Sequence, residues 1–323
     1  MISSNSRWLK PKRLCFGDTV GIVAPASPPP DPHAVDRAAA ALERFGFKPR
    51  LAKNIRARHG FLAGGDRERA ADLMAMFADK KVKAIFCLRG GYGSTRILDR
   101  LDYDFIRRHP KILAGYSDIT ALHDALAKKI KLISFHAPML NRELSDERLP
   151  AFTRNSFLRT VMEAKPAGSI VEGCIGGTVL TLRGGVAEGR LIGGNLSVLC
   201  ASLATPFQPS FKGAILFFED IGEAPYRLDR MLTQLLNAGI LRQVAGVAVG
   251  VNRNCVDPKD KAIDEYRQSA ADVVKERLAG LRVPVLTGLP FGHVALNATL
   301  PVGARARLDA NQGDLIITES AVN

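Results

Sequence analysis

A serine stands where an apolar segment gives way to a helical one. The stretch KILAGYSDITALHDALAKK begins at residue 111, and Ser117 lies at its corner. A serine on a tight strand-to-helix turn has an exposed hydroxyl, and the positive end of the following helix favours negative charge beside it. Such a residue is suited to nucleophilic attack on a carbonyl group. The second glycine of the G-x-S-x-G pattern is replaced by Ile119, so an N-cap formed by Ser117 or Asp118 is the structural alternative.

A glycine-rich loop follows the apolar run KAIFCL and reads RGGYGST from Arg89. Glycines allow backbone N–H groups to approach an anion closely. Phosphate binding is one such use, but the loop lacks both the Lys-Ser/Thr ending of a P-loop and the G-x-G-x-x-G spacing. An oxyanion hole is another use, and for it we expect the N–H of Asp118 and an N–H near Gly91. Simple tight turns are the third interpretation.

A serine nucleophile needs a base, and two histidines are placed to supply one. His136 ends the run KLISFH, and His293 ends VPVLTGLPFGH, so both can reach a site at the edge of a sheet. His123 follows Ser117 by six residues on the predicted helix and is expected to point away. The residues alone leave the choice between His136 and His293 open.

The base in turn needs a carboxylate to orient it. Glu219 ends the buried-type run AILFFE, where a charged group is costly unless it is paired. Asp220 and Glu223 compete with it for this role. The chain order of serine, acid and histidine matches that of α/β-hydrolases, which keeps that fold as an alternative.

The elements expected to hold these residues alternate between strands and helices. In the first half, apolar runs such as DTVGIVAPAS and KAIFC alternate with helical patterns such as DRERAADLMAMFADKKV. This alternation predicts an α/β fold with a parallel sheet covered on both faces. Ligands of such sheets gather at the carboxyl ends of the strands, where the serine and the glycine loop both lie.

A change of composition between residues 145 and 180 predicts a domain boundary. We assign residues 1–165 to an N-terminal α/β domain and residues 166–323 to a C-terminal domain. In the second domain, GTVLTLRGG and GRLIGGNLSVLCASL are interpreted as strands, RLDRMLTQLLNAG and DEYRQSAADVVKERLAG as helices, and ARARLDANQGDLIITES as a hairpin.

Composition limits the class of protein. The 323 residues are 46% hydrophobic, and no apolar run approaches the roughly 20 residues that a membrane span needs. We find no signal-peptide pattern, and the five cysteines form no C-x-x-C pair, so we expect reduced thiols, a cytoplasmic location and no metal site. The net charge of +13 is dispersed along the chain. This favours attraction of an acidic small substrate over nucleic-acid binding.

Six motifs together give the chain a resemblance to a known family. They are GDTVGIVAPASP, AIFCLRGGYGSTRIL, LAGYSDITALH, GRLIGGNLSVL, FFEDIGEAPYRLDRMLTQL and GLPFGH, and they span nearly the whole sequence. The chain resembles the LD-carboxypeptidase family, serine peptidase family S66, which includes murein tetrapeptide LD-carboxypeptidases and microcin C self-immunity peptidases. The resemblance implies a triad of Ser117, Glu219 and His293. It also implies a flavodoxin-like N-terminal domain, a C-terminal swivelling β/α domain, a cytoplasmic homodimer and no cofactor.

From the resemblance we expect a serine carboxypeptidase that cleaves an L,D-amide and releases the terminal D-alanine of murein tetrapeptide. The partner is then a small peptide, with no nucleic acid and no membrane, and Arg89, Tyr92 and Asn195 are candidates for contacting it. HAPM in place of the more usual H-G-P-M is a small departure from the family. Some microcin-directed members stack a nucleotide on an aromatic residue in the region that here spans residues 141–185, which has only Phe152 and Phe157, so the peptidoglycan interpretation is favoured. The alternatives are a peptide–nucleotide hydrolase, an esterase, and a non-catalytic nucleotide- or sugar-binding module.

Overall fold

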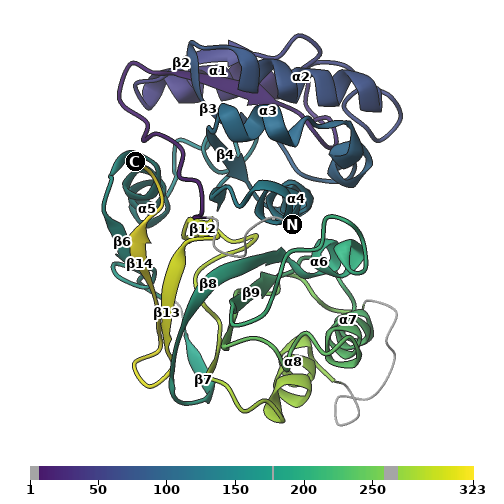
Figure 1. Ribbon diagram of the computed structural model, residues 1–323, viewed down its shortest axis with the longest axis vertical. Coiled ribbons are helices and arrows are strands. Elements are labelled where there is room, and N and C mark those ends of the chain that lie inside the picture. The colour runs from purple at the N-terminus through teal and green to yellow at the C-terminus, as the bar shows by residue number, and fades with distance from the viewer. Residues whose placement is uncertain (1–6, 177, 258–267) are drawn as a thin grey trace.

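The computed structural model describes residues 7–176, 178–257 and 268–323, which form two sheets and the helices around them (Figure 1). The elements of the first half follow in chain order: β1 (Thr19–Val23), α1 (Ala34–Arg44), β2 (Lys48–Leu51), α2 (Asp66–Ala78), β3 (Val82–Cys87), the 3-10 helix η1 (Ser94–Arg100), α3 (Tyr103–Arg108), β4 (Ile112–Gly115), the 3-10 helix η2 (Ser117–Ile119), α4 (Thr120–Ile130) and β5 (Ser134–His136).

The second half begins with a helix and then builds the larger sheet. Its elements are α5 (Ala151–Met162), β6 (Pro166–Ser169), β7 (Leu180–Arg183), β8 (Val186–Asn195), α6 (Leu196–Ser202), β9 (Ile215–Glu219), α7 (Pro225–Asn237), β10 (Gly246–Val249), α8 (Ala270–Ala279), β11 (Val285–Thr287), β12 (Leu300–Val302), β13 (Arg305–Asp309) and β14 (Asp314–Ser320).

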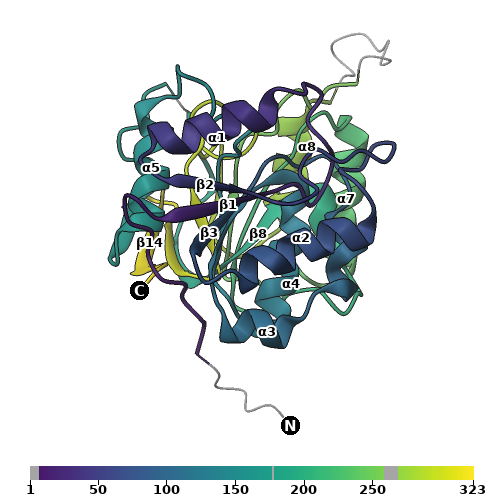
Figure 2. The ribbon, with the colours of Figure 1, turned by 90° about the horizontal axis from the view of Figure 1, so that it is seen from above.

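The first sheet has the order β12-β5-β4-β3-β1-β2, and all its strands except β12 run parallel. In Figure 2, α1 lies on one side of β1 and β2, while α2, α3 and α4 lie on the other. Central strands such as β3 and β4 are buried on both faces, because helices cover each side, and their sequences are accordingly continuous apolar runs. The α/β class predicted from the sequence is confirmed.

The second sheet has the order β6-β14-β13-β8-β9-β10-β11-β7. Its centre, β8 to β11, is parallel, and the flanking strands are antiparallel. β13 and β14 form the predicted hairpin around ANQGD, with Asp309 opposite Asp314. The parallel arrangement brings the carboxyl ends of β8 and β9 together, where Asn195 pairs with Glu219 in the register.

Two predicted elements differ at their ends. The expected strand GRLIGGNLSVLCASL stops at Asn195, whose side chain accepts a hydrogen bond from the N–H of Val198 and so starts α6. The helix expected from residue 264 begins at Ala270, where Ser269 and Asp272 form a capping box, and the predicted portion before residue 268 lies outside the described residues.

The two halves of the chain are joined through the first sheet. β12, from the second half, pairs antiparallel with β5, so that Leu300 lies opposite His136. One hydrophobic core also contains residues from both halves, including Ile85 of β3 and Phe217 of β9. The division at residue 165 stays a prediction. β12 lies after residue 165 in the sequence but belongs to the sheet that the first half forms.

Within the described residues, no helix combines the length and apolar character that crossing a membrane requires.

Candidate active site

Ser117 lies at the corner between β4 and α4. It adopts a φ of +61°, a left-handed conformation that a non-glycine residue seldom takes. Directly before it, Tyr116 is extended, with a φ of −145°, so the backbone changes from an extended to a left-handed conformation within one residue. Strain of this kind is held in place by surrounding structure and gathers at functional sites. The corner is the tight strand-to-helix turn that the sequence predicts.

The turn is supported from beneath by His123. Its Nε2 lies 2.9 Å from the carbonyl oxygen of Gly115, and its Nδ1 lies 2.8 Å from the hydroxyl oxygen of Ser134. Burial lowers the pKa of His123 to about 4, so the ring is neutral at physiological pH. His123 therefore holds the end of β4, a structural role that its spacing from Ser117 did not reveal.

Glu219 and His293 form a buried pair. Nδ1 of His293 lies 2.7 Å from Oε2 of Glu219, the last residue of β9, and both side chains are buried. Close approach depends on Gly292, which has a φ of +113° and whose added Cβ would lie 2.8 Å from the same carboxylate oxygen. With Nδ1 engaged by the carboxylate, Nε2 of His293 is the ring atom left for proton transfer.

The pair of Glu219 and His293 lies next to the turn of Ser117, because the ring of His293 packs against that of Tyr116. The ring of His293 lies with its centroid 4.7 Å from that of Tyr116, the residue before Ser117. The nucleophile candidate from the first half and the acid–base candidates from the second half thus meet at one place, at the carboxyl ends of β4 and β9.

His136, the other histidine left open by the sequence, has different surroundings. It packs behind Tyr116, with ring centroids 5.6 Å apart, and against Phe217 at 5.4 Å. Neither ring nitrogen has a hydrogen-bond partner in the described part of the chain, and burial lowers its pKa well below the usual value. The contact with Glu219 is made by His293 and not by His136.

The two competing carboxylates are engaged elsewhere. Asp220 accepts hydrogen bonds from the Asn195 side chain and from the N–H of Ser197, each at 2.9 Å, and burial raises its pKa to about 6. Glu223 pairs with Arg227 at 3.5 Å near the start of α7. The two residues are four positions apart, a spacing at which opposite charges pair along a helix, and this gives Glu223 a structural role.

The glycine loop lies against the serine turn at Gly90, one residue before the predicted Gly91. A Cβ added to Gly90 would lie 3.0 Å from the Cβ of Ser117 and 3.1 Å from its Oγ. Gly91 has a φ of +102° and backs onto Ser27, whose Oγ would be 2.5 Å from an added Cβ. The N–H of Gly91 makes no hydrogen bond with any other described group, so it is available to a ligand.

Three side chains fix this loop in place. The N–H of Tyr92 donates to Oγ of Ser27 at 3.1 Å, and the N–H of Ser94 donates to Oδ2 of Asp118 at 2.8 Å. Arg69 is almost fully buried, and its guanidinium donates to the carbonyl of Gly93 at 2.8 Å and to the carbonyl of Pro25. Asp118, predicted for its N–H alone, thus also ties the loop to the serine turn through its carboxylate.

Comparison with known proteins identifies the family of this chain. The model of the LD-carboxypeptidase N-terminal domain matches residues 20–137, and that of the LD-carboxypeptidase C-terminal domain matches residues 188–308. A probable murein peptide carboxypeptidase of Bacillus subtilis is 41% identical over 95% of this chain and 94% of its own length. The chain belongs to the LD-carboxypeptidase family. This membership makes it a peptidase, as the motifs predict.

Other members of the family extend the likeness. The murein tetrapeptide carboxypeptidase of Pseudomonas aeruginosa is 32% identical over 91% of this chain and 94% of its own length. A crystal structure of muramoyltetrapeptide carboxypeptidase from Oxalobacter formigenes is 32% identical, covers 93% of this chain and 99% of its own, and has a TM-score of 0.78. A structure of MccF in complex with glutamyl sulfamoyl guanosine is 26% identical, covers 98% of this chain and 100% of its own, and has a TM-score of 0.85.

The residues predicted to contact substrate have partners within the protein. Arg89 donates to the carbonyl of Pro28 at 2.6 Å, and Asn195 is buried at the start of α6. Tyr92 is half exposed beside Phe61, with ring centroids 5.7 Å apart. Their roles in substrate contact stay predictions.

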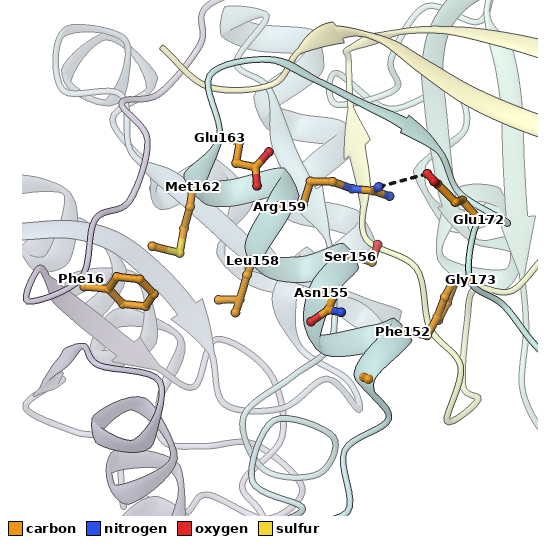
Figure 3. A pocket seen from close by; sticks show the side chains of 11 residues that line it. Phe16, Phe152, Asn155, Ser156, Leu158, Arg159, Met162, Glu163, Glu172 and Gly173 are labelled. Atoms are coloured by element: carbon orange, nitrogen blue, oxygen red, sulfur yellow. Dashed lines mark hydrogen bonds and ion pairs between the residues drawn. The ribbon is translucent and has the colours of Figure 1, made fainter.

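Two hollows on the surface of the described residues differ in their relation to the site. A groove of about 720 Å³ runs along α5, where Phe16, Leu158 and Met162 gather and Arg159 pairs with Glu172 (Figure 3). None of the three triad candidates lines it. A smaller cavity, of about 130 Å³, is lined by His293 together with Arg142, Glu143, Leu149, Pro150 and Arg253. We call this smaller hollow the His293 cavity.

Proposed function

We propose that this peptidase is a serine LD-carboxypeptidase that removes the terminal D-alanine from murein tetrapeptide. The observation that carries the proposal is the buried pair of Glu219 and His293, which lies beside the strained turn of Ser117. The names of the relatives from Bacillus subtilis and Pseudomonas aeruginosa, both murein peptide carboxypeptidases, support the choice of substrate.

In the first chemical step, Nε2 of His293 takes the proton of the Ser117 hydroxyl as the oxygen attacks the scissile carbonyl. Glu219 keeps the imidazole in the correct tautomer and stabilises the imidazolium that forms. The N–H of Asp118 and the N–H of Gly91 are proposed to hold the oxyanion of the tetrahedral intermediate. The fixed loop needs no reorganisation at that moment, because Arg69 and its neighbours already hold it.

The intermediate then collapses to an acyl-enzyme. The C–N bond breaks, and His293 returns its proton to the leaving amine, which departs as the free D-amino acid. Water next attacks the ester carbonyl while His293 accepts one of its protons, and the Ser117 oxygen leaves with that proton. The shortened peptide is released with a new carboxylate, and the enzyme returns to its starting state.

A peptide–nucleotide substrate is the second candidate. The TM-score of 0.85 to the MccF complex with glutamyl sulfamoyl guanosine favours it. The one tryptophan of the chain, Trp8, packs so closely against Gly303 that a Cβ added there would overlap its ring. The guanidinium carbon of Arg190 lies 5.5 Å from the centroid of the same ring. These contacts give Trp8 a role in packing the fold, which argues against its use as a platform for a nucleotide base.

The test offers the purified protein a panel of substrates with mass detection. We expect cleavage of a tetrapeptide ending in D-alanine and no cleavage of the all-L isomer or of a glutamyl sulfamoyl nucleoside. Ser117→Ala and His293→Ala should each lower kcat by roughly 10⁴–10⁶, and the double variant should be little worse, because triad members act as a unit. Ser210→Ala, at an exposed position, is the matched control. Equal cleavage of the all-L peptide, or an active His293→Ala variant, would overturn the proposal.

We further propose a cytoplasmic homodimer. Buried thiols such as Cys87, Cys200 and Cys255 fit a reducing compartment. The homodimer is what the family resemblance implies. Light scattering after size-exclusion chromatography measures the mass directly, and a monomer at micromolar concentration would contradict the oligomeric state.

A further inference from the structure

The His293 cavity is lined by two arginines that form no ion pair within the described ranges. The side chain of Arg142 makes no hydrogen bond or ion pair with any described residue, and Arg142 lines the cavity. Arg253 donates from Nη1 to the carbonyl oxygen of His293 at 2.9 Å and forms no ion pair within the described ranges. A guanidinium has five N–H donors, so both arginines retain donors for a ligand.

The carboxylates around the same cavity are already satisfied. Glu143 accepts a hydrogen bond from the Tyr116 hydroxyl at 2.7 Å and another from the N–H of Met139 at 3.1 Å. Asp146 accepts from the N–H of Arg148 at 2.9 Å, and hydrogen bonds from Arg148 lower the pKa of Asp146. The donors left without a partner in the cavity are therefore cationic, which suits a carboxylate ligand.

The position of the cavity relative to His293 indicates which part of a substrate it takes. In the proposed mechanism His293 gives its proton to the leaving amine, so the leaving residue must lie against this imidazole. His293 itself lines the cavity. We propose that the His293 cavity binds the leaving D-amino acid, with Arg142 and Arg253 holding its terminal carboxylate; this inference rests on the proposed function.

Size and lining agree with a small terminal residue. The volume of about 130 Å³ is small compared with the 720 Å³ of the groove along α5, as a site for a single small residue requires. Leu149 and Pro150 supply apolar surface for a methyl group. The cavity thus offers what the terminal residue of an exopeptidase substrate needs, namely cations for its carboxylate and apolar surface for a small side chain.

The experiment compares a tetrapeptide ending in D-alanine with its C-terminal amide. The wild type should strongly prefer the free acid. Arg142→Gln is the main variant because the Arg142 side chain forms no hydrogen bond or ion pair with a triad candidate. We expect kcat/KM for the free acid to fall about 10–100-fold while the amide rate stays the same. Arg253→Gln and the double variant should lower the preference further. Arg154→Gln, an exposed arginine of α5 outside the cavity, is the control and should match the wild type.

A second measurement separates this inference from the catalytic one. An organophosphonate serine probe should label Ser117 in Arg142→Gln as fast as in the wild type, which shows that the triad is intact. A free-acid preference that survives in Arg142→Gln and in the double variant overturns the carboxylate assignment while leaving the proposed function standing. A wild type that cleaves neither peptide overturns both.

Discussion

Replacing Gly90 by alanine tests the proposed oxyanion hole at its most sensitive point. The added methyl would lie 3.1 Å from Oγ of Ser117 and 3.3 Å from the backbone nitrogen of Asp118. It therefore occupies the space where the oxyanion would form and covers the donor that follows the nucleophile. Gly90 does not need the left-handed backbone region, so alanine introduces no conformational strain of that kind.

The size of the effect follows from these distances. Contacts of 3.0–3.3 Å require the neighbours to move by a few tenths of an ångström, so the free energy of unfolding should fall by no more than about 1–3 kcal/mol, the usual range for overpacking. Loss of one oxyanion donor typically costs 10²–10³ in kcat, or about 2.7–4 kcal/mol of transition-state stabilisation. We therefore expect kcat to fall at least about 100-fold while the protein stays folded.

The assay measures kcat on the D-alanine-terminated tetrapeptide and Tm by thermal unfolding. Gly280→Ala serves as the control, because an added Cβ there has open space around it and the backbone has a φ of −77°. The reasoning is refuted if Gly90→Ala keeps kcat within about threefold of the wild type, since a methyl group in a working oxyanion hole cannot be neutral.

Three further predictions extend the test. Glu219→Gln should lower kcat by up to about 10⁴, whereas Glu223→Gln should change it only a few-fold, and comparable losses in steady-state kinetics would leave the orienting acid unassigned. Gly292→Ala, at a φ of +113° beside the Glu219 carboxylate, should lower both Tm and kcat, and an unchanged Tm would contradict the close approach. Asp124→Asn should stabilise the protein increasingly as pH rises. Burial raises the pKa of Asp124 in the folded protein, so above about pH 4 the unfolded chain releases this proton more readily and the wild type loses stability. Asparagine does not titrate, so the variant does not have this loss. Thermal unfolding at pH 5 and pH 8 checks this, and a stability difference that is the same at both values would show that Asp124 is not the cause.

Much of the first sheet could be predicted because its central strands are continuous apolar runs. Strands β3 and β4 and helices α2 and α4 follow the patterns in the sequence. β12 could not be predicted, because a three-residue strand has no periodicity of its own and forms only where β5 offers an edge. The junction at Asn195 was missed because an apolar strand and a buried helix such as α6 have similar compositions.

The site shows the same division between local and distant information. Ser117 was recognisable from its turn, and Glu219 from the cost of a carboxylate in an apolar run. The choice between His136 and His293 depends on which ring reaches Glu219, and residues 74 positions apart in sequence give no sign of that contact. Arg69 was missed because it lies in a charged helical pattern that resembles a solvated face, although its side chain is almost fully buried.

The pairing of β12 with β5 has a consequence for how the protein is made. β5 is complete once residue 136 has been synthesised, but its partner at residues 300–302 comes from near the other end of the chain. At about 5–20 residues per second, the ribosome needs roughly 10–30 s to produce the intervening segment. During this time the edge of β5 is an unpaired template for other strands, which is a risk for aggregation of the nascent chain. A truncated first half should therefore be much less soluble than the full-length protein, and premature termination of translation should yield an insoluble product that lacks peptidase activity.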